Sequence, residues 1–192
     1  MKRLITVLLM LCFTAVTWGQ KYKTGGDSQA YRIIETDTVF ANKTLYDNIK
    51  NMPDFSITAK IMELTGAQEE LNTLGMCTVF LPSNQAFSAL DEDALKALLS
   101  PANAQRLKDA FMSHVVTGRV DANSYARMAA ANQGSAIFRS PGAIDPELTV
   151  AGTTAYLSVP NAPKATITAT NYFHAQGYLH IVDGFLLPEP NN

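Results

Sequence analysis

The stretch that decides the fold lies near the end of the chain, where residues 176–188 read Gln-Gly-Tyr-Leu-His-Ile-Val-Asp-Gly-Phe-Leu-Leu-Pro. Gly177 opens an apolar run that carries His180 and Asp183, and Pro188 closes it, which is typical of a strand. The odd spacing directs the side chains of His180 and Asp183 to opposite faces of that strand, so they cannot act together as a catalytic dyad. We expect His180 to satisfy buried polar groups and Asp183 to fix the turn that follows.

Two further boxes lie upstream and share a family pattern with this stretch. The first reads Thr-Val-Phe-Leu-Pro-Ser-Asn-Gln-Ala-Phe over residues 78–87, and the second reads His-Val-Val-Thr-Gly over residues 114–118. Together the three boxes resemble fasciclin-type domains, and the resemblance covers residues 42–188. It implies an α+β fold, a β-wedge or sandwich of about seven mainly antiparallel strands with a packed layer of helices from the N-terminal half. It also implies a secreted or cell-surface adhesion module whose motif residues are structural: Thr78, Phe80, Pro82, Ser83, Asn84, Phe87, His114, Gly118, Gly177, His180, Asp183 and Pro188.

The first box predicts a strand-to-helix corner. Residues 76–81 are apolar at successive positions, which indicates a strand covered on both faces. We expect Pro82 to end the ladder, Ser83 to cap the next turn and Phe87 to anchor that turn to the core. Asn84 either bonds to backbone at this corner or binds a ligand. The first role is favoured because asparagine commonly serves local turns and caps.

The second box predicts the end of a long helix. His114 falls on one apolar face with Leu107 and Phe111, and Gly118 is expected to supply the left-handed stop soon after. Animal members of the resembling family often carry a tyrosine before this histidine, in a pair linked to integrin recognition. Ser113 stands at that position here, so this role does not carry over. We expect His114 to be buried and hydrogen-bonded to backbone.

Hydrophobic spacing predicts helices in the first half of the chain and strands in the second. One helix is expected to end at Pro53, a second at Gly66, a third to be capped by Asp91, and a fourth to begin at Ser100-Pro101. After about residue 155, apolar and polar residues alternate, which predicts antiparallel strands with one face on a core. Helices first and antiparallel strands second is an α+β arrangement.

The N-terminus has the layout of a secretory signal peptide. Lys2 and Arg3 precede an apolar run over residues 4–16, and small residues lie ahead of Gln20. The run is shorter than the roughly 20 residues of a membrane span, so a retained N-terminal anchor is the weaker alternative. We expect an exported protein, found in the periplasm, on the cell surface or secreted, with no stable membrane span after cleavage. The chain then divides into a signal peptide (1–20), a leader with an extended segment (21–41), the fasciclin-type domain (42–188) and a tail (189–192).

Charge limits the class of partner that the chain can bind, and cysteine content limits the disulfides that it can form. The chain holds 15 basic and 17 acidic residues, and loss of Lys2 and Arg3 leaves a net charge of −4. No basic stripe is present, which argues against a nucleic-acid partner. Cys77 is the one cysteine after residue 20, so no intrachain disulfide is expected, and its apolar neighbours indicate a small buried side chain.

Motifs for catalysis and for cofactor binding are missing from the sequence. It contains no phosphate-binding glycine loop, zinc-type cysteine pairing, calcium loop or nucleophile elbow. The spacing of His114, His174 and His180 does not predict a metal site. We therefore expect no catalytic residue, no cofactor and no metal. The hypothesis is a non-catalytic module that recognises a protein or an extracellular or cell-surface polymer through its surface. The alternative is a carrier of a small molecule, glycan or lipid in a pocket between helices and sheet, and the oligomeric state stays open.

Overall fold

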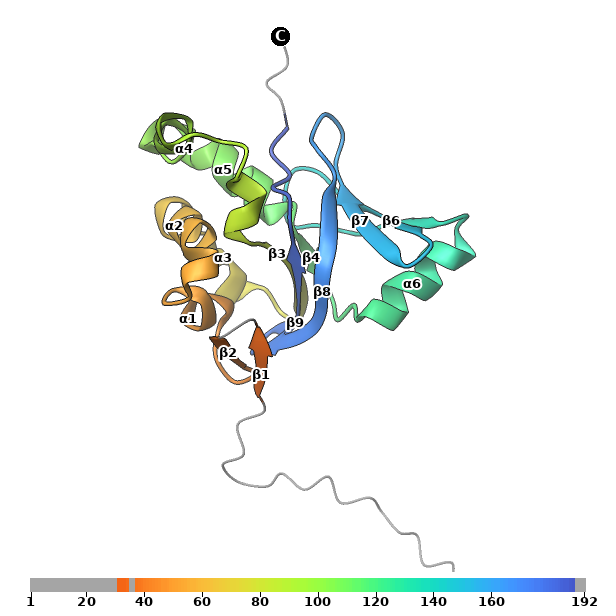
Figure 1. The fold of residues 1–192 in the computed structure, drawn as a ribbon. Helices are drawn as coiled ribbons and strands as arrows, with labels where there is room; N and C mark the ends of the chain where they lie inside the picture. Colours follow the sequence, from red (N-terminus) through yellow and green to blue (C-terminus); the bar gives the residue numbers. More distant parts are fainter. Residues whose placement is uncertain (1–30, 35–36, 189–192) are drawn as a thin grey trace, which may run out of the picture.

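The structure is a computed structural model that describes residues 31–34 and 37–188 (Figure 1). The predicted signal peptide (1–20), the first part of the predicted leader and the predicted tail (189–192) lie outside these residues. Within the described ranges, no helix has the length and apolar character needed to cross a membrane.

The helices of the first half form as predicted. The segment that begins at Leu45 ends before Pro53, and the next helix ends at Gly66, which has a φ of +68°. Asp91 caps its helix by accepting a hydrogen bond of 2.8 Å from the Ala94 N–H. The elements are α1 (Leu45–Ile49), η1 (Pro53–Phe55), α2 (Ser56–Thr65), α3 (Ala67–Thr73), η2 (Asn84–Phe87), α4 (Glu92–Leu98), η3 (Pro101–Asn103) and α5 (Ala104–Met112).

The main sheet has seven strands in the order β4-β3-β9-β8-β7-β6-β5. Every neighbouring pair is antiparallel except β3 and β9, which run parallel. The predicted α+β fold with about seven mainly antiparallel strands is confirmed. The strands are β3 (Cys77–Pro82), β4 (Val115–Thr117), β5 (Ser135–Ile137), β6 (Glu147–Ala151), β7 (Thr154–Ser158), β8 (Ala165–His174) and β9 (Gly177–Val182).

Strand β3 ends at Pro82. Pro82 is paired with Val182, and the Ser83 N–H still donates to the Val182 carbonyl at 3.0 Å. The prediction that Pro82 ends the ladder is confirmed, since it is the last paired residue of β3. Alternate N–H groups of this strand point to opposite neighbours, since that of Phe80 donates to the His114 carbonyl. The missing N–H of Pro82 falls on the side away from β9, so the pairing with β9 does not need it.

Two separate cores lie on the two faces of the sheet (Figure 1). On the face covered by α1 to α5, Val79 and Leu81 pack with Phe87, whose ring centroid lies 5.2 Å from that of Phe185. On the other face, Phe80 packs beneath β5 to β7 and a further helix, α6 (Ala122–Ala131). Alternation along β3 thus feeds both cores, which explains why every residue of this strand is buried.

Helix α6 was not predicted from the sequence. The local signal is Asp121, whose carboxylate accepts a hydrogen bond of 2.7 Å from the Ser124 N–H and caps the helix. Tyr125 and Ala129 form its buried face. The helical layer from the N-terminal half therefore covers one face of the sheet, and a helix from the second half contributes to covering the other.

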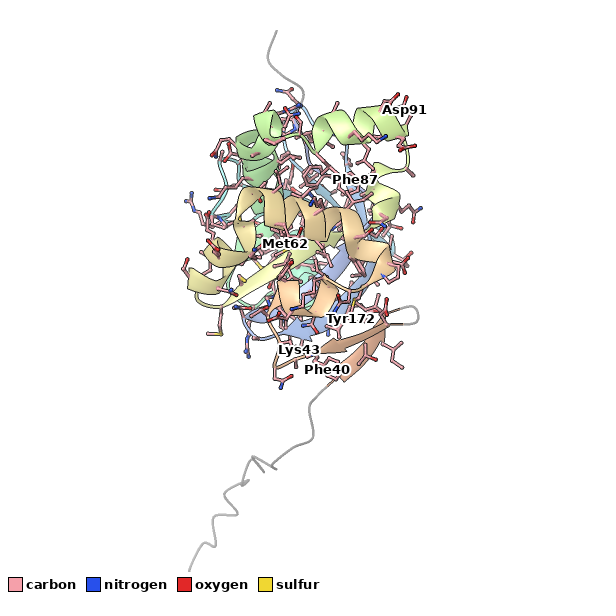
Figure 2. The ribbon with its side chains drawn as sticks, turned by 90° about the vertical axis from the view of Figure 1, so that its left-hand side faces the viewer. Phe40, Lys43, Met62, Phe87, Asp91 and Tyr172 are labelled. Atoms are coloured by element: carbon pink, nitrogen blue, oxygen red, sulfur yellow. The ribbon has the colours of Figure 1, made fainter. Side chains whose placement is uncertain are left out.

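A two-stranded hairpin, β1 (Tyr31–Ile34) and β2 (Asp37–Phe40), lies against the helical side. Ile34 and Val39 are buried in the helix-side core. The Asn48 side chain of α1 accepts a hydrogen bond of 2.7 Å from the Phe40 N–H and donates back to the Phe40 carbonyl at 3.0 Å. In Figure 2 the hairpin lies below the helical layer, with Phe40 and Lys43 at its end. The hairpin is thus fastened to the body of the molecule.

The two edges of the main sheet meet beside β4. The Thr117 N–H donates to the Arg139 carbonyl at 2.9 Å, and Arg139 lies two residues after the end of β5. One residue later, the Ser140 hydroxyl donates to the Met112 carbonyl at the end of α5 at 2.8 Å. These bonds draw the sheet into a wedge around the second core.

Candidate functional site

The histidine of the second box is part of the helix-side core. His114 is fully buried, and its Nε2 accepts a hydrogen bond of 2.9 Å from the Leu186 N–H. The ring stacks on Phe185 with a centroid distance of 5.4 Å. Burial lowers the pKa of His114 to about 3, and the neighbouring Phe80 backbone offsets this only in part. The ring is therefore neutral, and because Nε2 accepts, Nδ1 carries the proton.

The histidine of the third box joins three segments in the second core. Nε2 of His180 donates to the Val120 carbonyl at 2.8 Å, and Nδ1 accepts from the Asn171 N–H at 3.3 Å. The ring stacks on Phe80 at a centroid distance of 5.2 Å. Burial is the main reason that the pKa of His180 falls to about 4, although the Asp121 carboxylate acts in the opposite direction. Both ring nitrogens are thus bonded to backbone.

Thr78 and Gly118 hold the loop that leads to α6. The Thr78 hydroxyl donates to the Gly118 carbonyl at 2.9 Å and accepts from the Val120 N–H at 2.9 Å. Gly118 has a φ of +90°, and its N–H donates to the Met76 carbonyl at 2.8 Å. The prediction that Gly118 stops the long helix is wrong, because β4 lies between α5 and this residue. Its left-handed backbone ends a strand instead.

The third box fastens both ends of β9. Gly177 begins the strand. After it, the Asp183 carboxylate accepts a hydrogen bond of 2.6 Å from the Thr166 N–H, and the Asp183 N–H donates to the Thr166 carbonyl at 3.1 Å. At the exit, the Pro188 carbonyl accepts from the Arg106 guanidinium of α5 at 2.7 Å.

Asn84 organises the corner between β3 and the helical layer. Its Oδ1 accepts a hydrogen bond of 3.1 Å from the Ile57 N–H in the first turn of α2, while Nδ2 donates to the Pro53 carbonyl at 2.8 Å and to Ser56 Oγ at 3.0 Å. The structure thus places Asn84 in the backbone-bonding role. Ser83 was expected to cap the turn, and this is wrong, because its side chain forms no capping bond. A distant amide caps α2, whose own preceding residue offers no side-chain cap.

Replacing Asn84 with alanine is expected to lower the free energy of unfolding by about 1–2 kcal/mol, because the Ile57 N–H and the Pro53 carbonyl lose their partner. Asn84→Asp keeps the acceptor for the Ile57 N–H but loses the donor for Pro53, so an intermediate loss is expected. Chemical denaturation of the three proteins measures both values. Equal stability of Asn84→Ala and wild type would contradict the proposed clamp.

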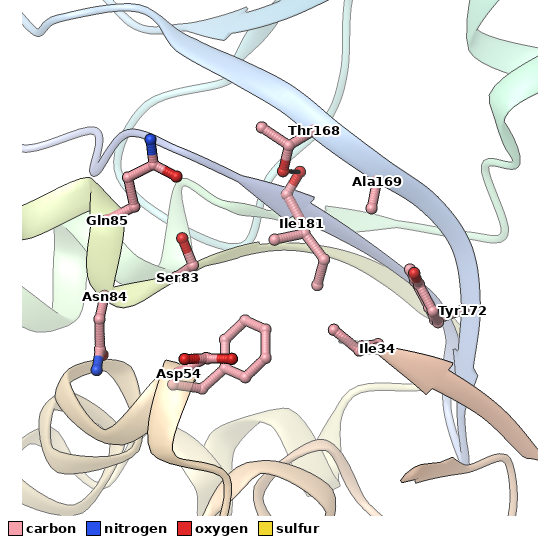
Figure 3. Close-up of a pocket in the computed structure, with 10 residues that line it drawn as sticks. Ile34, Asp54, Ser83, Asn84, Gln85, Thr168, Ala169, Tyr172 and Ile181 are labelled. Carbon is pink, nitrogen blue, oxygen red and sulfur yellow. Dashed lines mark hydrogen bonds between the residues drawn. The ribbon is translucent and has the colours of Figure 1, made fainter. Parts of the chain in front are cut away.

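A cleft of about 380 Å³ opens between this corner and β8 (Figure 3). One wall comes from η1 and η2, and the other comes from β8. The polar groups that line the walls are Asp54, Ser83, Asn84, Gln85, Thr168 and Tyr172, and the apolar floor is formed by Ile34, Phe55, Ala169 and Ile181. Among the described residues that line this cleft, none is a lysine or an arginine.

Similarity to known proteins assigns the chain to a family. The family described as Fasciclin domain matches residues 53–188 of the chain. The chain belongs to the fasciclin domain family. A similar protein is Protein sll1483 of Synechocystis sp. (strain ATCC 27184 / PCC 6803 / Kazusa), 27% identical over 138 residues, which cover 70% of this chain and 67% of that protein. Among solved structures, the FAS1 domain pair from the insect cell adhesion molecule fasciclin I matches with a TM-score of 0.63 and 17% identity. The match covers 83% of this chain and 58% of the insect chain.

The cleft of this fasciclin domain borders the first box and, through Ile181, the third box, but not the second. Ser83, Asn84 and Gln85 line it directly, whereas His114 and His180 lie in the two cores. Of the polar lining residues, only Ser83 and Asn84 were predicted from the sequence. Gln85 has a local signal because it lies within the box. Thr168 and Tyr172 have none, since they reach the cleft only through the pairing of β8 with β9.

A second cavity of the fasciclin domain offers fewer polar groups than the cleft. It has a volume of about 530 Å³ and lies beside α5, where Ala102, Ala110 and Ile144 give it a largely apolar lining, and the Arg106 at its edge is bonded to Pro188. In the part of the chain that the structure describes, no group of three or more histidine, cysteine or acidic side chains is placed to hold a metal ion.

Proposed function

We propose that the protein is a non-catalytic binding module that acts outside the cytoplasm and recognises a protein or an extracellular or cell-surface polymer through its surface. The observation that supports this most is the use of the motif histidines. His114 bonds to the Leu186 backbone, and His180 bonds to the backbones of Val120 and Asn171. A general base must reach the group that it deprotonates. Nε2 of His114 and both ring nitrogens of His180 bond to backbone, and both rings are buried, so a substrate cannot reach them.

Family membership supports the same proposal. Fasciclin domains are, as a family, adhesion and binding modules. The insect relative is named a cell adhesion molecule, and its structure holds two such domains, whereas this chain spans 58% of its length. By analogy we infer that this chain supplies one adhesive unit.

The carrier alternative has weaker support. A carrier binds its ligand in a deep, mostly apolar pocket, which hides most of the ligand from water. The cleft between helices and sheet is instead lined by side chains that are partly open to solvent, such as Asp54, Gln85 and Thr168. Both cores are closed around fully buried side chains such as Phe80 and Phe111. This arrangement favours recognition at the surface.

Co-sedimentation with cell-envelope material tests the binding proposal. We expect the purified protein to sediment with envelope preparations and the association to saturate. Protease treatment of the envelope abolishes binding if the partner is a protein, and periodate treatment abolishes it if the partner is a polysaccharide. Export is tested in parallel by N-terminal sequencing of the protein from the envelope or medium, with Gln20 or Lys21 expected as the first residue.

The outcomes that would overturn the proposal are specific. One is hydrolysis of an esterase, glycosidase or peptidase substrate that disappears in a folded His180→Gln variant. Another is recovery of the protein in the cytoplasm with Met1 intact. A third is the absence of saturable binding to untreated envelope material.

A further inference from the structure

We propose that the cleft between the Asn84 corner and β8 is a subsite for an uncharged pyranose, such as a terminal or side-chain sugar of a glycan. The inference rests on the proposed binding function and names the class of ligand that this site accepts. It does not require that every contact with the partner be made here.

The walls of the cleft carry the polar groups that a sugar ring needs. In Figure 3, Asp54, Ser83 and Gln85 border the cavity on one side, and Thr168 and Tyr172 border it on another. An ionised carboxylate accepts hydrogen bonds only, whereas hydroxyl and amide groups both donate and accept. Hydroxyl groups of a pyranose also do both, so a ring between these walls finds partners along its edges.

The floor suits the apolar face of such a ring. Phe55 and Ile181 lie at the bottom of the cleft and belong to the helix-side core, with 2% and 5% of their surfaces exposed. A pyranose presents C–H groups on its ring faces and hydroxyls around its rim. Polar walls above an aromatic and aliphatic floor match this division, and small-molecule sites commonly combine an apolar lining with a few placed polar groups.

Charge in the cleft selects against acidic sugars. Among the lining residues that the structure describes, Asp54 is the one carboxylate, and none carries a basic side chain that could pair with a carboxylate, sulfate or phosphate on the ligand. A ligand anion placed next to Asp54 would be repelled and left without a counter-charge. A neutral sugar avoids this cost while its hydroxyls still donate to Asp54.

The walls are held in place before any ligand arrives. Asn84 bonds to the Pro53 carbonyl, which fixes η1 and therefore Asp54 relative to η2. On the other side, the Thr168 hydroxyl donates to the Ile181 carbonyl at 3.3 Å, which leaves its oxygen lone pairs to accept from a ligand. A preformed site loses less conformational entropy on binding.

Titration with simple sugars tests the proposal. The probes are the methyl glycosides of glucose, galactose and mannose, with glucuronic acid as the anionic counterpart, and the readout is the NMR shift of backbone amides. We expect at least one neutral glycoside to give saturable shifts in residues 54–55, 83–85 and 168–172. We also expect it to bind at least tenfold more tightly than glucuronic acid.

Matched variants locate the binding site. Asp54→Asn and Thr168→Val each remove one wall group, and each is expected to weaken binding of the neutral glycoside at least tenfold. Asp93→Asn, an exposed carboxylate on α4, and Thr149→Val on β6 are the controls, and no change is expected for either. Far-UV circular dichroism checks that the variants are folded.

Three results would overturn the inference: no saturable shifts with any neutral glycoside, preferred binding of glucuronic acid, or equal weakening by the control variants. The inference and the proposed function fail separately. If no neutral glycoside binds the cleft while envelope material still binds the protein, the module binds elsewhere and this subsite is refuted. If sugars bind the cleft but envelope material does not bind the protein, the proposed function is refuted.

Discussion

Replacing Gly177 with alanine is expected to destabilise the protein by about 3 kcal/mol or more. Gly177 pairs with Cys77 in the parallel β3–β9 ladder at the centre of the sheet. A Cβ atom at position 177 would overlap the Cys77 carbonyl oxygen, which is backbone and cannot rotate away. The two strands would have to separate where the sheet is covered on both faces, so the substitution strains both cores.

Gly75→Ala is the matched control, because a Cβ atom at position 75 meets no atom within 4 Å. We expect its free energy of unfolding to stay within about 0.5 kcal/mol of the wild-type value. Chemical denaturation compares the three proteins. A Gly177→Ala protein as stable as the Gly75→Ala protein would show that the strands do not approach as closely as the structure indicates.

Acidification is expected to destabilise the protein steeply below neutral pH. Burial lowers the pKa of His114 to about 3 and that of His180 to about 4, whereas a histidine in an unfolded chain has a pKa near 6.5. Below pH 6.5 the unfolded state therefore binds more protons than the folded state. The contribution of these two neutral histidines to the free energy of unfolding is fully present above pH 6.5. It is lost as the pH falls toward 4 for His180 and toward 3 for His114.

The expected loss at pH 5 is about 2 kcal/mol for each of these two histidines, from 1.4 kcal/mol per pH unit below 6.5. His174 contributes in the same direction, because burial also lowers its pKa. Denaturation curves at pH 7 and pH 5 give the difference in unfolding free energy. His180→Gln removes one titrating group, so we expect its pH-dependent loss to be smaller by about 2 kcal/mol. Equal stability at pH 7 and pH 5 in the wild type would contradict the buried, neutral state of these rings.

Local chemistry explains what the sequence could predict. The Asp91 cap, the Gly66 stop and the doubly covered strand β3 each depend on neighbours within a few residues, and all appear in the structure. Burial of His114 and His180 follows from their apolar surroundings in the same way. These features depend little on how distant segments meet.

The errors arose where a distant group replaced a local one. Ser83 has a side chain that can cap a turn, yet it forms no capping bond. The Asn84 side chain instead caps α2 by accepting a hydrogen bond from the Ile57 N–H, 27 positions earlier in the chain. Gly118 has the left-handed backbone expected of a helix stop, but it serves the end of β4. The cleft is a further case, since Asp54 and Thr168 become neighbours only once β8 is in place.

The position of β9 has a consequence for how the protein folds. This strand, the last that the structure describes, lies between β3 and β8, and its partner residue Cys77 precedes Gly177 by one hundred positions. Until residues 177–182 are available, β3 and β8 have no strand between them and both cores are incomplete. Pairings this far apart in sequence also form slowly, because a large loop must be ordered before any contact forms. The two cores are therefore expected to form together, at the step in which β9 joins β3 and β8.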